Sequence, residues 1–150
     1  MFEQADVRTS GPEPVFSPSE WAVEIHDVHQ ATRIRRAFRD YLMRYAAPES
    51  DVAAAELIFG ELLGNVVRYA PGPALFRLHW HGARPKLLVT DGGPGFARTP
   101  EGSLGDGVAE QGRGLALVRA FAVRLIMGNR KDGGAYVSVV LPVRRRQATA

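Results

Sequence analysis

The chain has 150 residues, of which 45% are hydrophobic and 23% are charged, values typical of one soluble globular domain. It contains no cysteine, which excludes disulfide bonds, thiolate metal sites and cysteine nucleophiles. Its net charge is +3, and Arg144–Arg146 alone account for this excess of positive charge. We therefore attribute the positive charge to a solvated tail and expect no direct nucleic-acid contact.

Both ends of the chain differ in composition from its middle. Residues 1–19 are rich in Pro, Ser, Gly and acidic residues, which predicts a flexible N-terminal arm, and residues 143–150 form a basic tail. Residues 20–142 are then the expected domain. No apolar run could cross a bilayer, and the first residues lack a secretory signal, so we expect a cytoplasmic protein without a membrane partner.

The first half of the domain predicts one strand and two helices. Residues 21–26 alternate apolar and mixed residues, as a strand does. A helix over about residues 29–45 has one apolar stripe, formed by Ile34, Phe38, Tyr41, Leu42 and Tyr45. A second helix begins near Ser50, after Pro48, and runs to about Ala70.

The second half predicts a hairpin, a loop, a helix and two closing strands. The ranges are strands at 74–81 and 86–90, a loop and candidate lid at 96–111, a helix at 114–123, and strands at 124–128 and 135–141. The order strand, helix, helix, two strands, helix, two strands favours an α+β fold. We predict a two-layer α/β sandwich, with a mixed, mostly antiparallel sheet and its helices on one face.

The second helix carries a narrow polar strip in an apolar surround. At ~100° per residue, Glu61, Asn65 and Arg68 fall on one line, and apolar residues cover most of the remaining surface. A helix that apolar is largely buried, so its Glu and Asn must be hydrogen-bonded, paired or bound to a metal. The alternative is a solvated strip with a Glu–Arg pair across two turns.

A second polar patch follows the strand at residues 86–90. Asp91 enters the run Gly92-Gly93-Pro94-Gly95, where a carboxylate accepts hydrogen bonds and glycines let a ligand approach the backbone. The alternative is an ordinary Asp-Gly turn.

A third patch, Gly112-Arg113-Gly114-Leu115, leads into a helix. Free backbone N–H groups and the positive end of a helix dipole suit phosphates, although a flexible loop meeting a helix has the same composition. No GxxxxGK[ST] run occurs, which excludes a Walker-type site, and a Rossmann site lacks its third glycine and its βαβ unit.

In this order the three patches resemble the N box, G1 box and G2 box of the GHKL (Bergerat) ATPases. Residues 57–70 look like the N box of the anti-sigma-factor serine kinase branch. Asp91–Phe96 is similar to its D-x-G-x-G-F motif, and Gly112–Val118 to its G-R-G-L-x-L-[VI] motif. The resemblance covers roughly residues 21–142 and implies the Bergerat fold with ATP and Mg²⁺ as cofactors.

The resemblance also implies a role for each box residue. Asn65 would ligate Mg²⁺, Glu61 would be the general base, and Asp91 would accept a hydrogen bond from the adenine amino group. Gly93 and Gly95 would admit the base and ribose, and residues 97–111 would be the lid. The remaining nucleotide-site residues are Gly112, Arg113 and Gly114 at the phosphates, with Arg68, Phe96 and Leu115 in the same boxes.

The function implied is that of an ATP-binding, anti-sigma-factor-like regulator with Mg-dependent serine/threonine kinase activity. Its partners would be a sigma factor, a STAS-type antagonist protein, or both. A homodimer is expected, with an exposed Trp21 on the first strand. Two alternatives stay open: a stand-alone histidine-kinase catalytic domain, and a nucleotide-binding or degenerate interaction module without kinase activity. The second rests on Ala135-Tyr136, which follow Gly133-Gly134 where the family often has Thr.

Overall fold

The structure is a computed structural model that describes residues 13–69, 72–96 and 106–147, with only the backbone described for 69 and 106–113. Its strands form one six-stranded sheet in the order β1-β2-β3-β4-β6-β5, and every neighbouring pair is antiparallel. The strands are β1 (Val15–Ser17), β2 (Glu20–Ile25), β3 (Ala74–His81), β4 (Arg84–Asp91), β5 (Arg124–Asn129) and β6 (Ala135–Val140).

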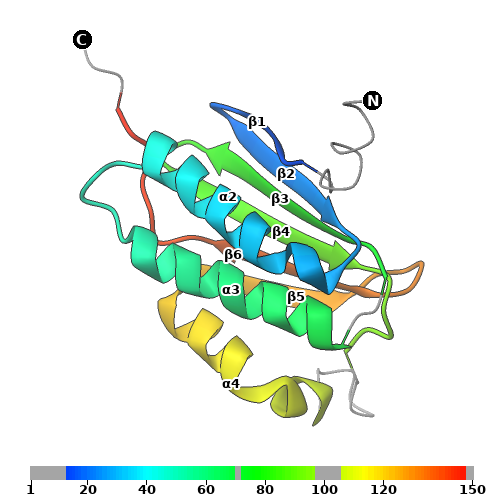
Figure 1. Ribbon diagram of the computed structural model, residues 1–150. Helices are drawn as coiled ribbons and strands as arrows, with labels where there is room; N and C mark the ends of the chain where they lie inside the picture. Colours follow the sequence, from blue (N-terminus) through cyan, green and yellow to red (C-terminus); the bar gives the residue numbers. More distant parts are fainter. Residues whose placement is uncertain (1–12, 70–71, 97–105, 148–150) are drawn as a thin grey trace, which may run out of the picture.

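The helices lie together on one face of this sheet (Figure 1). They are the short η1 (Val28–Gln30), α2 (Ala31–Tyr45), α3 (Val52–Tyr69) and α4 (Asp106–Phe121). Asp27 starts η1 with a capping box to Gln30, whose Oε1 accepts from the Asp27 N–H at 3.3 Å, and the Asp27 side chain also accepts from the His29 N–H at 3.0 Å. The predicted α+β sandwich with helices on one face is therefore confirmed.

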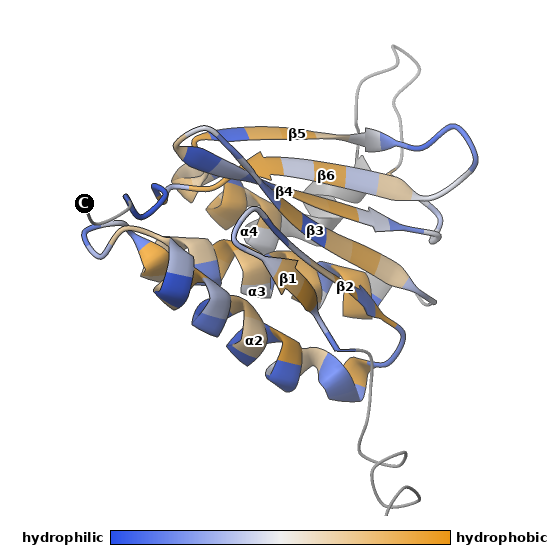
Figure 2. Cartoon of the chain, turned by 90° about the horizontal axis from the view of Figure 1, so that it is seen from above, coloured by the Kyte–Doolittle hydropathy of each residue, from blue (hydrophilic) through white to orange (hydrophobic). Residues whose placement is uncertain are grey.

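The core fills the space between the two layers. Strand β3 alternates between buried and exposed residues along its whole length, and its buried side faces the helices. In the middle, the rings of Phe38 and Phe59 stack with centroids 4.1 Å apart, and Trp21 meets both edge-on. Figure 2 shows the complementary pattern on α2, whose hydrophilic residues lie away from the sheet.

Trp21 is 1% exposed, so the expectation of an exposed tryptophan for dimer contact is wrong. The alternation of β2 places Trp21 on the helix side, where aromatic neighbours bury it. On β1 and α2, the exposed large apolar side chains are Val15, Phe16 and Met43. The homodimer itself stays a prediction.

The N-terminal arm is shorter than expected, because residues 15–17 form β1. Phe16 pairs with Trp21 in the hairpin with β2, and its ring meets Tyr41 edge-on at 6.0 Å. The short turn at Pro18 and Ser19 brings the two strands together, and the composition of this stretch concealed it. Residues 1–12 of the predicted arm lie outside the described residues.

The fold also continues past residue 142 into the predicted tail. Val143 is fully buried, and the N–H groups of Arg145 and Arg146 donate to the carbonyls of Ala83 and Tyr45. These backbone hydrogen bonds hold the tail against the domain, and composition alone does not predict them. No described helix is long and apolar enough to cross a membrane.

Tyr41 ties the β1 edge to the rest of the sandwich. Its hydroxyl donates to the Ser17 carbonyl at 2.9 Å and accepts from the Trp80 indole N–H at 3.1 Å. Burial raises the pKa of Tyr41, which keeps this hydroxyl protonated. Tyr41→Phe leaves both partners unsatisfied and is expected to lower the free energy of unfolding by about 1–2 kcal/mol.

Urea unfolding followed by circular dichroism measures this change. Tyr45→Phe is the matched control, because the Tyr45 hydroxyl makes no hydrogen bond to the residues that the structure describes. Equal stabilities for the two variants would show that the Tyr41 hydroxyl bonds contribute nothing net.

Candidate functional site

The polar strip of α3 lies where the sequence predicts it. Glu61 and Asn65 are half-buried and Arg68 is exposed, whereas the apolar residues around them, such as Leu62 and Leu63, are buried. The sandwich core therefore buries most of the large apolar side chains of α3 and leaves this strip at its margin. Glu61 and Asn65 supply two oxygen-bearing side chains one turn apart.

Helix α4 brings the third patch onto this strip. A Cβ atom added at Gly114 would lie 2.8 Å from Oε2 of Glu61 and 3.6 Å from Oδ1 of Asn65. The next residue, Leu115, is 3% exposed and anchors α4 in the core. The absence of a side chain at Gly114 thus lets the α4 backbone approach Glu61 closely.

The start of α4 differs from the prediction. The helix begins at Asp106, so Gly112, Arg113 and Gly114 lie inside it rather than at its first turn. The stretch from Val108 to Gln111 consists of residues that are compatible with a helix, but it lacks the apolar periodicity that would have identified it. The free helix start expected at these glycines is therefore not observed, and the phosphate-binding role of this segment stays a prediction.

The side chain of Arg113 and residues 97–105 of the predicted lid lie outside the described residues. The remaining lid residues, 106–111, belong to α4. Of the third patch, the structure therefore describes the α4 backbone and the residues Gly114 and Leu115.

Asp91 is held by backbone donors at the end of β4. Its Oδ1 accepts from the Gly93 N–H at 2.9 Å and from the Ala135 N–H at 3.4 Å. Its Oδ2 has no hydrogen bond to the described part of the chain. The carboxylate is thereby oriented by one oxygen, and the other oxygen is available to accept from a ligand.

Asn129, which the sequence analysis did not single out, holds the other end of this turn. Its Oδ1 accepts from the Phe96 N–H at 2.6 Å, and its Nδ2 donates to the Phe96 carbonyl at 2.8 Å. Phe96 itself is 8% exposed and packs in the core. An asparagine before a glycine-containing turn is common, so no sequence signal distinguished this one.

The neighbouring Arg130 was missed for the same reason. Its guanidinium donates to the Asp91 carbonyl at 3.1 Å and pairs with Asp132 at 3.2 Å. At Gly134, with φ +89°, an added Cβ would collide with the Asp91 carbonyl. The turn between β5 and β6 therefore lies directly against the start of the Asp91–Phe96 turn.

Two of the three patches are in contact, and the third lies at the same side of the molecule. Asp91 pairs with Ala74, the first residue of β3, which follows α3 after a short connection. Figure 1 accordingly places the end of β4 and the end of α3 at the same side of the molecule. The first and third patches are in contact at Gly114, whereas the second patch contacts the β5–β6 turn.

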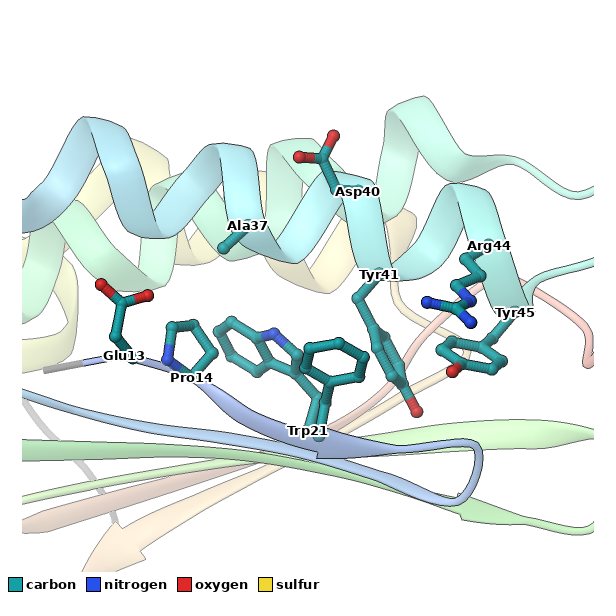
Figure 3. A pocket seen from close by; sticks show the side chains of 9 residues that line it. Glu13, Pro14, Trp21, Ala37, Asp40, Tyr41, Arg44 and Tyr45 are labelled. Atoms are coloured by element: carbon teal, nitrogen blue, oxygen red, sulfur yellow. The ribbon is translucent and has the colours of Figure 1, made fainter.

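A separate pocket of about 300 Å³ lies between β1 and α2 (Figure 3). Rings of Phe16, Trp21, Tyr41 and Tyr45 contribute to its wall, and Glu13 and Arg44 lie at opposite ends of the view. None of its lining residues belongs to the three patches. This pocket is therefore not part of the candidate site, which consists of the polar strip of α3, Gly114 of α4 and the Asp91–Phe96 turn.

Comparison with known proteins identifies a family for most of the chain. The family model described as histidine kinase-like ATPase domain matches residues 26–141. Among solved structures, a mycobacterial sensor histidine kinase, MprB, is similar with a TM-score of 0.50 and 18% identity, over 90% of this chain and 99% of that chain. At this identity the likeness shows the fold alone. The comparison with curated proteins gave no match.

Proposed function

The chain belongs to the histidine kinase-like ATPase domain family, and from this premise we propose that it binds Mg·ATP and transfers the γ-phosphoryl group to a serine or threonine of an antagonist protein. The observation that carries the proposal is the contact of Gly114 with the Glu61–Asn65 strip. This contact brings a carboxylate and an amide oxygen close to the segment that resembles the G2 box, and phosphoryl transfer depends mainly on positioned groups and charge neutralisation.

The adenine end of the nucleotide would bind at Asp91. Its Oδ1 is already used by two backbone donors, and its Oδ2 is left to accept a hydrogen from the adenine amino group. Gly93 and Gly95, in the same turn, present backbone without side chains to the base. The Ala135 N–H bond to Asp91 supports binding even though the hydroxyl that the family often has near this position is absent.

Asn65 is the described residue that would hold Mg²⁺. The described residues contain no cluster of three or more His, Cys, Asp or Glu that could hold a metal by itself. This donor set fits Mg²⁺, which prefers oxygen ligands and is often bound through one or two side chains together with nucleotide phosphates. When bound, the ion would neutralise phosphate charge.

Glu61 would act as the general base. A serine hydroxyl must lose its proton as its oxygen bonds to the γ-phosphorus and the bond to the β–γ bridging oxygen breaks, releasing ADP. The Glu61 carboxylate is half-buried and lies close to Gly114 of α4, in the segment to which the family resemblance assigns phosphate binding. This arrangement supports a hydroxyl acceptor, because such an acceptor needs a base.

Calorimetric titration with ATP and Mg²⁺ tests the first half of the proposal, and we expect saturable binding. The second half is tested by incubating the protein with γ-labelled Mg·ATP and a STAS-type protein from the same organism. Acid-stable phosphate on that protein is the expected result. Acid-labile phosphate would replace the proposal with histidine phosphotransfer, and the absence of nucleotide binding would leave an interaction module without turnover.

A further inference from the structure

We propose that Asn129 is a positioning residue that sets the preference for adenine over other bases, and this inference rests on the proposed nucleotide site. Its amide binds both backbone groups of Phe96, through the 2.6 Å bond at Oδ1 and the 2.8 Å bond at Nδ2. Two bonds to one residue fix both the position and the orientation of its peptide groups. The last residue of the Asp91–Phe96 turn is thus tied to the last residue of β5.

The turn and the amide also interlock sterically. Gly95 has φ +82°, and a Cβ atom added there would lie 2.7 Å from Oδ1 of Asn129. The amide therefore fills the space that any other residue at position 95 would need. This close fit leaves the turn little freedom to move while the Asn129 side chain is present.

The same segment holds the first residue of the turn. Arg130 donates to the Asp91 carbonyl at 3.1 Å, and the Ala135 N–H reaches Oδ1 of Asp91 at 3.4 Å. Both ends of the turn are consequently fixed by residues 129–135, which connect β5 to β6. A change at Asn129 releases the Phe96 end of the turn. Gly93, between the two ends, donates to Oδ1 of Asp91 at 2.9 Å, so a shift of the released turn moves one of the donors that orient this carboxylate toward a bound base.

Recognition of the base would depend strongly on where the Asp91 carboxylate lies, whereas binding of the phosphates would depend on it less. A carboxylate selects a base by a hydrogen bond with a donor at a defined position, and such selection is lost when the carboxylate moves. The side chains proposed for the phosphate end, Glu61 and Asn65, are on α3 and make no described contact with Asn129. Loss of the Asn129 bonds should therefore reduce the discrimination between bases and leave the triphosphate contribution unchanged.

The test compares Asn129→Ala and Asn129→Asp with the wild type. Asn129→Asp keeps the size and the acceptor for the Phe96 N–H, but replaces the Nδ2 donor with an oxygen that faces the Phe96 carbonyl. Lys131→Ala, an exposed position in the same β5–β6 turn, is the matched control. The measured quantities are the Kd values for Mg·ATP, Mg·GTP and Mg·tripolyphosphate, together with the thermal unfolding midpoint.

The expected result is a roughly tenfold fall in the ratio of the GTP Kd to the ATP Kd in both Asn129 variants, the effect of losing about one discriminating hydrogen bond. Tripolyphosphate binding should be unchanged, and Lys131→Ala should match the wild type. A ratio that stays constant while ATP and GTP weaken together would overturn this inference and leave the proposed function standing. Failure of the wild type to bind any nucleotide would overturn both. If Asn129→Ala does not fold, the near-isosteric Asn129→Asp decides between these outcomes.

Discussion

Asp91→Asn is expected to weaken the binding of Mg·ATP by roughly 100-fold while the fold stays intact. The asparagine can keep its Oδ1 bond with the Gly93 N–H, so the turn retains its internal hydrogen bond. The other atom then becomes an amide nitrogen, which presents hydrogens to the adenine amino group. A charge-assisted hydrogen bond is thereby replaced by two donors facing each other, a change of about 2–3 kcal/mol.

Calorimetric titration of the variant with Mg·ATP measures this loss, and thermal unfolding checks the fold. Asp40→Asn is the matched control, because Asp40 is an exposed acid on α2 and belongs to none of the three patches. An ATP Kd for Asp91→Asn within threefold of the wild-type value would show that Asp91 does not contact the base.

Sequence periodicity predicted most of the fold because most elements bury one clear face. The alternation in Phe76, Leu78 and Trp80 gave the bounds of β3, and the apolar stripe of α2 gave a helix that ends at Tyr45. Strand β1, which was not predicted, and the start of α4, which was placed too late, lack such a face. Strand β1 has only three residues between prolines, and the first two turns of α4 carry no apolar stripe.

The candidate site was predictable to the extent that its residues are local in sequence. Glu61 and Asn65 share a helix face, and Asp91 begins a glycine-rich turn, so each pattern is visible without the fold. Asn129 contacts Phe96 across 33 residues, and this contact depends on the antiparallel pairing of β4, β6 and β5. No local pattern contains that information, which is why the residues that hold the turn were missed.

Gly114 was predicted as a site residue, but the structure gives a different reason for its presence there. The sequence suggested a glycine that opens a helix and exposes N–H groups to phosphate. In the structure it lies inside α4, and its missing side chain admits the helix backbone to Glu61. Closeness of α4 to Glu61, rather than a free helix end, is therefore the observation on which the assignment of the base depends.

Glu61→Gln is expected to lower the rate of phosphoryl transfer by roughly 1,000-fold, within the range of general-base catalysis, while the Kd for Mg·ATP changes little. Glutamine has nearly the same size, so the approach of α4 at Gly114 is preserved. An amide cannot take the proton of the acceptor hydroxyl, so the loss should fall on the chemical step.

The measurement is the single-turnover rate of phosphate transfer from labelled Mg·ATP to the STAS-type acceptor, with binding followed separately. Glu56→Gln is the matched control, since Glu56 lies on the same helix and its carboxylate is 3.9 Å from the Arg39 guanidinium rather than at the site. A wild-type rate in Glu61→Gln would assign the base to another group. Equal losses in rate and in ATP affinity would instead make Glu61 a binding residue, because a base acts only once the hydroxyl attacks.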